Sequence, residues 1–192
     1  MVVNGAVKEG SVTSTEIISS VDVSSIIEAL LFVSDVPLSV DKLLEVFDGV
    51  DRGTLCQILE ELRVRFNSNG KPFVLREISG GLQLCTDPKY APWIKKLSSV
   101  RANSKLSRAA LETLAIVAYK QPVTRAEIES VRGVNCAGVL TSLLERKLIR
   151  IAGRHDAPGK PLLYRTTQEF LQHFGLRSLN DLPRITELKE LC

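Results

Sequence analysis

The sequence has 192 residues, is 44% hydrophobic and carries 25 Lys and Arg against 22 Asp and Glu, a net charge of +3. This length and composition are typical of an ordinary globular chain of one or two domains. The longest apolar run, residues 114–119, is far shorter than the roughly 20 residues of a membrane span, and the N-terminus lacks a signal-peptide pattern. We therefore expect no membrane segment.

The distribution of charge and the cysteine content indicate the kinds of partner and the cellular compartment to expect. Residues 1–100 hold 10 basic and 13 acidic residues (net −3), whereas residues 101–192 hold 15 and 9 (net +6), so the two halves are expected to have different partners. None of Cys56, Cys85, Cys136 and Cys192 forms a C-x-x-C motif. This pattern predicts a reduced intracellular protein, with Cys56 and Cys136 buried in apolar helices.

The first half predicts three helices, a β-hairpin and a fourth helix. Residues 1–22 have no sustained periodicity, so we expect a flexible tail. The first helix is predicted to begin near Ser24, as its N-cap, and to end before Pro37. Ser39 and Asp51 are the expected N-caps of the next two helices. Strands at 73–78 and 82–86, a helix with Trp93 at its centre, and a polar linker at 98–105 follow.

The second half repeats this order. A helix ends at Gln121-Pro122, Thr124 and Glu127 form a capping box for a second helix, and a third helix spans about 135–147. Strands at 148–152 and 161–166 follow, then a helix that is predicted to begin at Thr166 and to end at Gly175. Three helices and a two-stranded wing predict a winged helix.

The two halves therefore predict an internal repeat. Pro37 and Pro122 lie 85 residues apart, and the same offset matches Leu43 with Ile128 and residues 29–31 with 114–116. The predicted fold is α+β and mainly helical, with two tandem winged-helix domains at 23–100 and 101–176. Residues 177–192 form a C-terminal tail with an apolar residue at every third position, which either packs on the second domain, is disordered or binds a partner.

No catalytic, metal or cofactor site is predicted. Residues 153–160 resemble a phosphate-binding P-loop, but the spacing is one residue too long and Pro161 replaces the required hydroxyl. His155 and Asp156 lie in the same loop without a nucleophile nearby, and two histidines in the chain give a zinc site little to draw on.

DNA binding is the alternative function. A helix-turn-helix contacts bases through the start of its third helix, but that region of the second domain has neither Arg nor Lys, and Asp51, Glu60 and Glu61 lie on the corresponding helix of the first. A sequence-specific regulator is therefore disfavoured. Four residues of the second wing are either solvated or make weak contacts with DNA phosphates: Arg150, Arg154, Lys160 and Arg165.

Three stretches closely resemble the segregation and condensation protein B family: LAIVAYKQPVTRAEIE at 114–129, LLER at 143–146 and PGKPLLY at 158–164. The resemblance extends more loosely over the first half, through IEALLF at 27–32, and covers about residues 24–183.

The resemblance implies a non-enzymatic, cytoplasmic and nucleoid-associated subunit of the bacterial SMC condensin complex. Such proteins form homodimers, mainly through the first winged helix, and bind the kleisin subunit, segregation and condensation protein A, which bridges the SMC ATPase heads. DNA contact would be weak or indirect. The exposed side of the second wing, with Arg154, Leu163 and Tyr164, is the predicted kleisin contact, and a core role for Leu163 and Tyr164 is the alternative.

Overall fold

The computed structural model describes residues 22–68, 70–97 and 105–184. They form an α+β fold of two tandem winged helices and divide into two compact units. Among these residues, unit 1 runs to Arg76 and includes Leu82–Cys85, and unit 2 comprises Glu77–Gly81 and the chain from Thr86 onward. The predicted N-terminal tail (apart from Asp22), nearly all of the linker and the end of the C-terminal tail lie outside the described residues.

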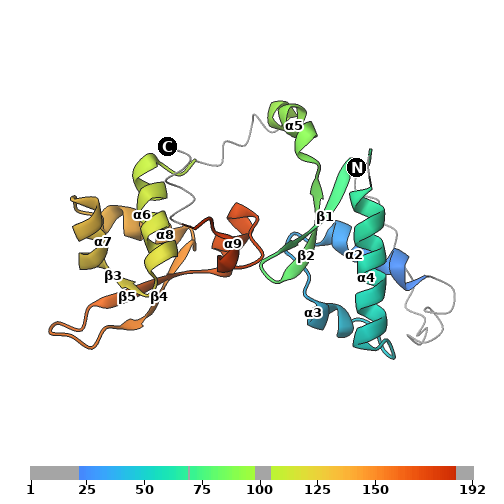
Figure 1. Cartoon of the computed structure of the whole chain (residues 1–192), viewed down its shortest axis with the longest axis horizontal. Helices are drawn as coiled ribbons and strands as arrows, with labels where there is room; N and C mark the ends of the chain where they lie inside the picture. The colour runs from blue at the N-terminus through green and yellow to red at the C-terminus, as the bar shows by residue number, and fades with distance from the viewer. Residues whose placement is uncertain (1–21, 69, 98–104, 185–192) are drawn as a thin grey trace, which may run out of the picture. The chain divides into compact units, whose positions relative to one another are not determined.

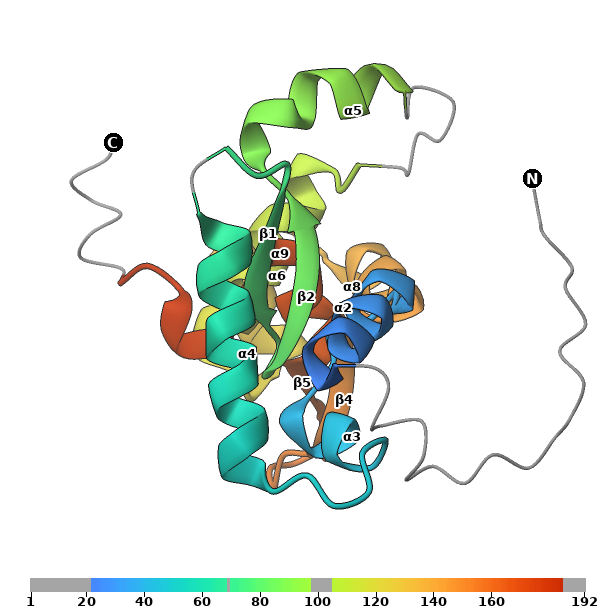
Figure 2. The same ribbon diagram turned by 90° about the vertical axis from the view of Figure 1, so that its right-hand side faces the viewer.

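Unit 1 is built on three helices: α2 (Val23–Val33), α3 (Val40–Leu44) and α4 (Arg52–Asn67). The hairpin of β1 (Phe73–Ile78) and β2 (Gly81–Thr86) follows, as predicted. Figure 2 shows α4 running alongside this hairpin, where the Asn67 side chain bonds both the N–H and the C=O of Leu75. Leu38 and Leu82 add one isolated bridge to the hairpin.

The helix starts of unit 1 follow local capping chemistry. Ser39 and Asp51 cap α3 and α4, as predicted, because their side chains accept hydrogen bonds from otherwise unpaired N–H groups. The prediction for α2 was wrong by two residues, since Asp22 is its N-cap and the N–H of Ser24 donates to the Asp22 carboxylate. A carboxylate and a hydroxyl two residues apart can both cap, so the sequence did not separate them.

The hairpin is followed by a 3-10 turn (η1, Pro88–Tyr90) and helix α5 (Ala91–Leu97). None of the residues of α5 is buried, and Trp93 and Leu97 are 65% and 85% exposed. The predicted helix thus exists, but its apolar side chains are not part of a core.

Unit 2 contains helices α6 (Arg108–Lys120), α7 (Arg125–Arg132) and α8 (Ala137–Glu145). Its sheet has the order β3–β5–β4, all antiparallel, and is made of β3 (Val123–Thr124), β4 (Ile149–Arg154) and β5 (Leu162–Thr166). Helix α9 (Gln168–Phe174) and a 3-10 turn, η3 (Leu179–Asp181), complete it. Figure 1 shows β4 and β5 extending from the helices as the long wing.

Two helix boundaries of unit 2 test the sequence predictions. The capping box is present: the Thr124 N–H donates to Glu127 Oε2 at 2.7 Å, and the Glu127 N–H donates to Thr124 Oγ1 at 3.3 Å. The trailing helix begins later than predicted, because Thr167 rather than Thr166 caps α9. The N–H and hydroxyl of Thr166 both donate to Gln121 Oε1 instead, at 2.9 and 3.0 Å.

Each unit has its own apolar core. The first contains Ile27, Leu31, Leu38, Leu43, Phe47, Leu55, Leu59, Leu62 and Leu75. The second contains, among others, Leu114, Val117, Ile128, Leu140, Leu143, Ile149, Tyr164 and Phe170. Leu176 and Leu182 pack against this second core, so the start of the predicted C-terminal tail follows the packing alternative.

The internal repeat is real, but its offset is not constant. Ser39 and Asp51 correspond to Thr124 and Cys136 at the predicted offset of 85. The first helices do not follow it, since their C-caps, Ser34 and Gln121, lie 121 − 34 = 87 residues apart. The buried pair Ile27 and Leu31 therefore corresponds to Leu114 and Ala118, and the predicted match of residues 29–31 with 114–116 was wrong. Two additional residues in the turn before Pro37 account for the shift.

Candidate functional site: an apolar groove and a basic recess on unit 2

The wing does not present the three predicted kleisin contacts together. Tyr164 is buried in the second core, where it pairs with Val123 on one side and Ile151 on the other. Its core role is therefore the alternative that the structure shows. Leu163 is half-buried, and Arg154 is exposed, with Nη1 donating to the Lys160 carbonyl at 3.2 Å. Only Arg154 has the exposure that was predicted for this set.

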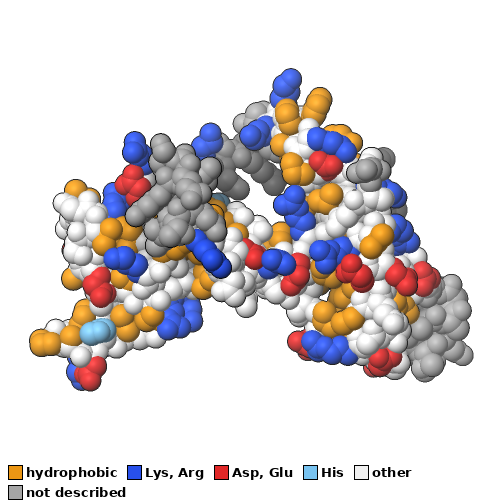
Figure 3. Space-filling model, in the orientation of Figure 1, with side chains coloured by type: hydrophobic (Ala, Val, Ile, Leu, Met, Phe, Trp, Pro, Cys, Tyr) orange, Lys and Arg blue, Asp and Glu red, His pale blue; other side chains and the backbone are white. Residues whose placement is uncertain are grey.

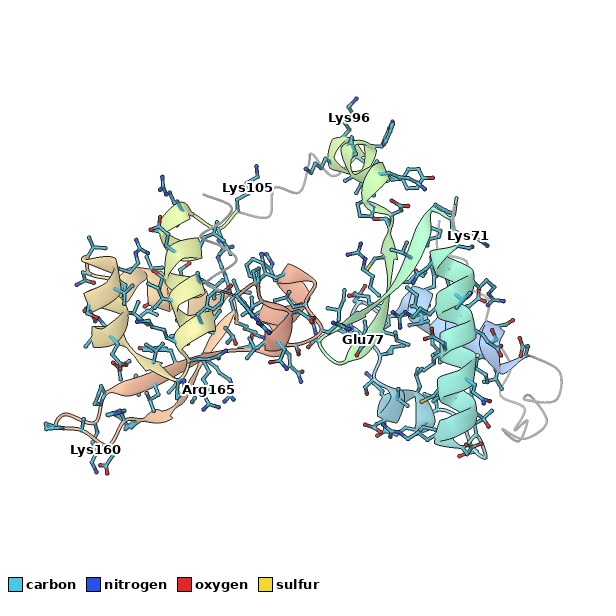
Figure 4. All side chains as sticks on the ribbon, viewed as in Figure 1. Lys71, Glu77, Lys96, Lys105, Lys160 and Arg165 are labelled. Atoms are coloured by element: carbon cyan, nitrogen blue, oxygen red, sulfur yellow. The ribbon has the colours of Figure 1, made fainter. Side chains whose placement is uncertain are left out.

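The four basic residues of the wing fall into two pairs. Arg150 and Arg165 are direct register partners on β4 and β5. Arg154 and Lys160 lie further out, and Figure 4 shows Arg165 near the base of the wing and Lys160 at its tip. Figure 3 likewise shows a cluster of basic side chains at the base of the wing and hydrophobic side chains along it. A single phosphate or carboxylate can therefore meet Arg150 and Arg165, but not all four.

An apolar recess on unit 2 was not predicted. It is a groove of about 340 Å³ between α6, α9 and the segment after α9. Leu111 and Tyr119 on α6 and Phe174 on α9 are 44%, 36% and 43% exposed in it. We call this the apolar groove, and its lining is Leu111, Leu114, Ala115, Ala118, Tyr119, Phe170, Phe174, Leu176, Leu182 and Pro183.

The position of the apolar groove is fixed by ordinary packing. Phe170 is buried in the core and so fixes α9, and its ring lies tilted against that of Phe174, with the centroids 4.9 Å apart. The Tyr119 hydroxyl donates to the Pro183 carbonyl at 2.7 Å, which fixes the segment after α9 along α6. One signal in the sequence pointed to the groove: α6 has apolar residues around more of its circumference than one core face needs.

A second recess, lined by both polar and apolar side chains, lies on the same unit. It has a volume of about 470 Å³ and contains Arg150 and Arg165 but no acidic residue. We call this the basic recess, and its lining is Gln121, Arg150, Arg165, Thr166, Thr167, Gln168, Leu171 and Leu179. The apolar groove and the basic recess share α9 and the segment that follows it, from which each takes different side chains.

Unit 1 exposes apolar side chains at the end of α2. Phe32, Val33 and Val36 are 74%, 78% and 47% exposed, and we call these three residues the α2 patch. Scattered exposed apolar residues are normal on monomers, but adjacent large ones mark interaction surfaces.

The helices that would contact bases are poorly suited to DNA. At the start of α8, Cys136 is buried, and its N–H donates to the Glu129 carboxylate, which also pairs with Arg125. These bonds, from Cys136 first and then Arg125, hold the pKa of Glu129 below its usual value, and they occupy Arg125 and the N–H of Cys136 within the fold. In unit 1, Asp51 begins α4 and its pKa is likewise lowered, first by the Thr54 hydroxyl.

The described ranges contain no cluster of three or more His, Cys, Asp or Glu residues that is placed to hold a metal. No helix in those ranges combines the length and apolarity that crossing a membrane requires. Of the cysteines, Cys136 is buried as predicted, but Cys56 is exposed because it lies on the outer face of α4. That prediction for Cys56 was wrong.

Fold and surfaces together define a tandem winged-helix protein whose exposed recesses are better suited to polypeptide than to base edges. Residues 25–185 match the model of the family described as "Segregation and condensation complex subunit ScpB". The chain belongs to this family, as its sequence resemblance implied.

Curated relatives agree. The chain is 49% identical to segregation and condensation protein B of Syntrophotalea carbinolica over 172 residues, 90% of this chain and 86% of that protein. It is 47% identical to the protein of the same name from Acetivibrio thermocellus over 167 residues, 86% of this chain and 83% of that protein. The family is thus named for a complex subunit and not for an enzymatic activity.

Two solved structures are similar in sequence. ScpB from Mycobacterium tuberculosis is 36% identical, with 87% of this chain and 99% of that chain covered and a TM-score of 0.38. A dimer of an ScpB N-terminal domain complexed with an ScpA peptide is 29% identical, with 42% and 98% covered and a TM-score of 0.37. With superpositions this loose, the fold described above rests on the elements of the chain itself.

Proposed function

We propose that this chain is a non-enzymatic subunit of the bacterial SMC–kleisin complex that binds, as a homodimer, the kleisin segregation and condensation protein A. In that role it supports chromosome condensation and segregation in the cytoplasm, at the nucleoid, and reaches the SMC ATPase through the kleisin. Membership of the family supports the complex, and the exposed apolar surfaces support the polypeptide partners.

The apolar groove is the observation that carries the proposal. Its walls are almost entirely apolar, and three large side chains in it are more than one third exposed, so an apolar segment of a partner would remove them from water. We propose that a kleisin segment fills it, in the manner of a helix bound in a groove. Arg154 and Leu163 on the wing remain proposed kleisin contacts, separate from the groove, whose lining contains neither.

The α2 patch is the proposed surface for self-association. A two-fold dimer buries the same surface of both copies, and adjacent apolar residues satisfy this requirement without charge pairing. We propose a dimerising first domain at 23–100 and a kleisin-binding second domain at 101–176, to which the packed residues up to Pro183 are added.

Kleisin binding is tested by one substitution in the groove and one outside it. Leu111→Glu places a carboxylate among the groove side chains and should weaken binding of the cognate kleisin at least ~10-fold, measured by calorimetry. Val131→Glu is the matched control, because Val131 is 50% exposed on α7 and lines no part of the groove. Equal loss in both variants, or in neither, would contradict the proposal.

Salt separates this proposal from the alternative of a DNA-binding regulator. Binding through apolar burial should persist to ~0.5 M salt, whereas a protein that uses Arg150, Arg154, Lys160 and Arg165 on phosphates should lose affinity steeply between about 50 and 200 mM. Titration of a duplex DNA under the same conditions gives the comparison.

A further inference from the structure

Arg150 and Arg165 are two like charges on adjacent strands, and Glu169 lines an adjoining recess together with Arg150. The two arginines face each other across the antiparallel strands β4 and β5, so their side chains leave the same face of the sheet at neighbouring positions. Within the part of the chain that the structure describes, neither arginine forms an ion pair. Like charges directly opposite each other in a sheet repel, so the fold alone does not favour this arrangement.

Three of the four neutral polar side chains of the basic recess, those of Gln121, Thr166 and Thr167, already form hydrogen bonds within the fold. Gln121 Oε1 accepts two hydrogen bonds from Thr166. The Thr167 hydroxyl donates to the Lys147 carbonyl at 2.6 Å and accepts from the Phe170 N–H at 3.1 Å. Each guanidinium, in contrast, presents up to five donors, and no carboxylate lines the recess to accept them. The recess is therefore prepared for an anionic acceptor.

The surroundings indicate a polypeptide anion and not a phosphate chain. Leu171 and Leu179 form part of the same recess. On the other side of α9, Phe170 and Phe174 line the apolar groove, so cationic and apolar surfaces alternate over the width of one short helix. A DNA backbone gains from the cations alone, whereas a peptide with acidic residues beside apolar ones gains from both.

We propose that Arg150 and Arg165 together bind carboxylate side chains of the kleisin, at acidic residues that flank the apolar segment filling the apolar groove. This inference rests on the proposed function and adds to it a second, charged site on the same partner. Paired guanidinium–carboxylate hydrogen bonds are directional, so the site would fix the register of the kleisin along α9.

The test uses the full chain and the cognate kleisin. Arg165→Gln should weaken kleisin binding about 10-fold at low salt, and the double variant Arg150→Gln/Arg165→Gln about 100-fold, with a smaller salt dependence than that of the unsubstituted protein. Lys105→Gln removes the same charge from an exposed position of unit 2 that lines neither recess, and should change the affinity less than ~2-fold.

Two further measurements make the result specific. The midpoint of thermal unfolding of Arg165→Gln should be equal to or above that of the unsubstituted protein, because the repulsion is relieved, whereas a structural role would lower it. Duplex DNA binding should be the same for all variants.

Three results would overturn the inference: unchanged kleisin affinity in the double variant, an equal loss in Lys105→Gln, or a loss of DNA binding alone. The first would leave the proposed function intact, provided that the unsubstituted protein binds the kleisin. Failure of the unsubstituted protein to bind would overturn the proposed function and this inference together.

Discussion

The two winged helices have the same order of helices and strands but differ in the third strand, the third helix and the trailing helix. In the second winged helix the short strand β3 pairs with the wing to give a three-stranded sheet. The third helix, α8, has 9 residues, and the buried side chain of Phe170 anchors the trailing helix, α9. In the first winged helix a single bridge, Leu38 with Leu82, takes the place of β3, and the third helix α4 has 16 residues. The helix that follows its hairpin, α5, falls within unit 2 and has no buried residue.

This difference agrees with the proposed division of roles between the two domains, kleisin binding and dimerisation. Unit 2 uses its trailing helix to complete its own core and to line the apolar groove and the basic recess, where we propose that the kleisin binds. Unit 1 leaves large apolar side chains of α2 and α4 exposed, among them Phe32, Val33 and Val64. A small domain that leaves apolar area uncovered gains stability by association, which agrees with its proposed role in the dimer.

The trailing helices give the largest contrast. Phe170→Ala should lower the free energy of unfolding of unit 2 by about 3–5 kcal/mol, because it empties a core position that is 3% exposed. Trp93→Ala in α5 should change the free energy of unfolding by less than about 0.5 kcal/mol, because the Trp93 side chain is 65% exposed. Urea unfolding followed by circular dichroism measures both, and comparable losses would show that α5 belongs to a core after all.

A second contrast concerns arginines on helices. Nη1 of Arg132 donates to the Ala109 carbonyl at 2.6 Å and to the fully buried Thr113 hydroxyl at 2.7 Å, and Nη2 pairs with Glu112. Arg132→Ala should therefore cost about 1–3 kcal/mol, since it leaves a buried hydroxyl with one partner fewer.

The matched control is Arg63→Ala in unit 1, which removes only an exposed pair with Glu60 and should cost less than about 0.5 kcal/mol. The same denaturation experiment applies. An equal loss of unfolding free energy in Arg63→Ala and Arg132→Ala would contradict the view that the exposed Arg63–Glu60 pair contributes little to stability.

The caps of α3 and α7 occupy the same place in the repeat. Ser39→Ala and Thr124→Ala should each cost about 1 kcal/mol, because each frees one helix N–H. Only Thr124→Ala should also alter the pH dependence of stability. The Thr124 N–H and hydroxyl lower the pKa of Glu127, so this contribution is present above the unfolded pKa, near 4.5, and is lost as pH falls through the lower folded pKa.

Denaturant titrations at a series of pH values between about 3 and 6 would reveal this effect. We expect a shallower acid loss in Thr124→Ala than in Ser39→Ala. Identical slopes in the two variants would contradict the assigned role of the Glu127 carboxylate.

Thiol reactivity gives the smallest effect. Cys56 is exposed on α4, whereas Cys136 is 2% exposed and burial raises the pKa of its thiol. Iodoacetamide should modify Cys56 of the folded protein quickly and Cys136 much more slowly, as measured by peptide mass spectrometry. Equal rates would show that the N-terminus of α8 opens in solution.

Much of the fold could be predicted from local patterns. Breaker prolines and the Thr124–Glu127 capping box are short-range signals, and the helices that they delimit end or begin where they were predicted. The first hairpin is also as predicted, except that its second strand begins one residue earlier, at Gly81. Helix caps with a competing residue nearby were harder to predict. Asp22 caps α2 in place of Ser24, and Thr167 caps α9 in place of Thr166. Thr166 is not available as a cap because it donates to Gln121, a contact that depends on the tertiary structure.

The site was less predictable than the fold. The basic character of Arg150 and Arg165 was visible in the sequence, but their opposition depends on the register of β4 and β5, which includes a bulge between Ile151 and Gly153. The apolar groove depends on how α9 and the segment after it pack on α6, a long-range contact that no local pattern specifies. The prediction that Cys56 is buried was wrong because the helical pattern of α4 does not specify which of its faces packs on the core, and Cys56 lies on the exposed face.

The most direct test of the proposed function is the mass of the protein by light scattering, alone and with the cognate kleisin, at about 0.5 M salt. We predict a dimer of about 42 kDa, twice the chain mass of 21.1 kDa, that becomes heavier by the mass of bound kleisin. A monomer of 21.1 kDa that gains no mass with the kleisin would contradict the account.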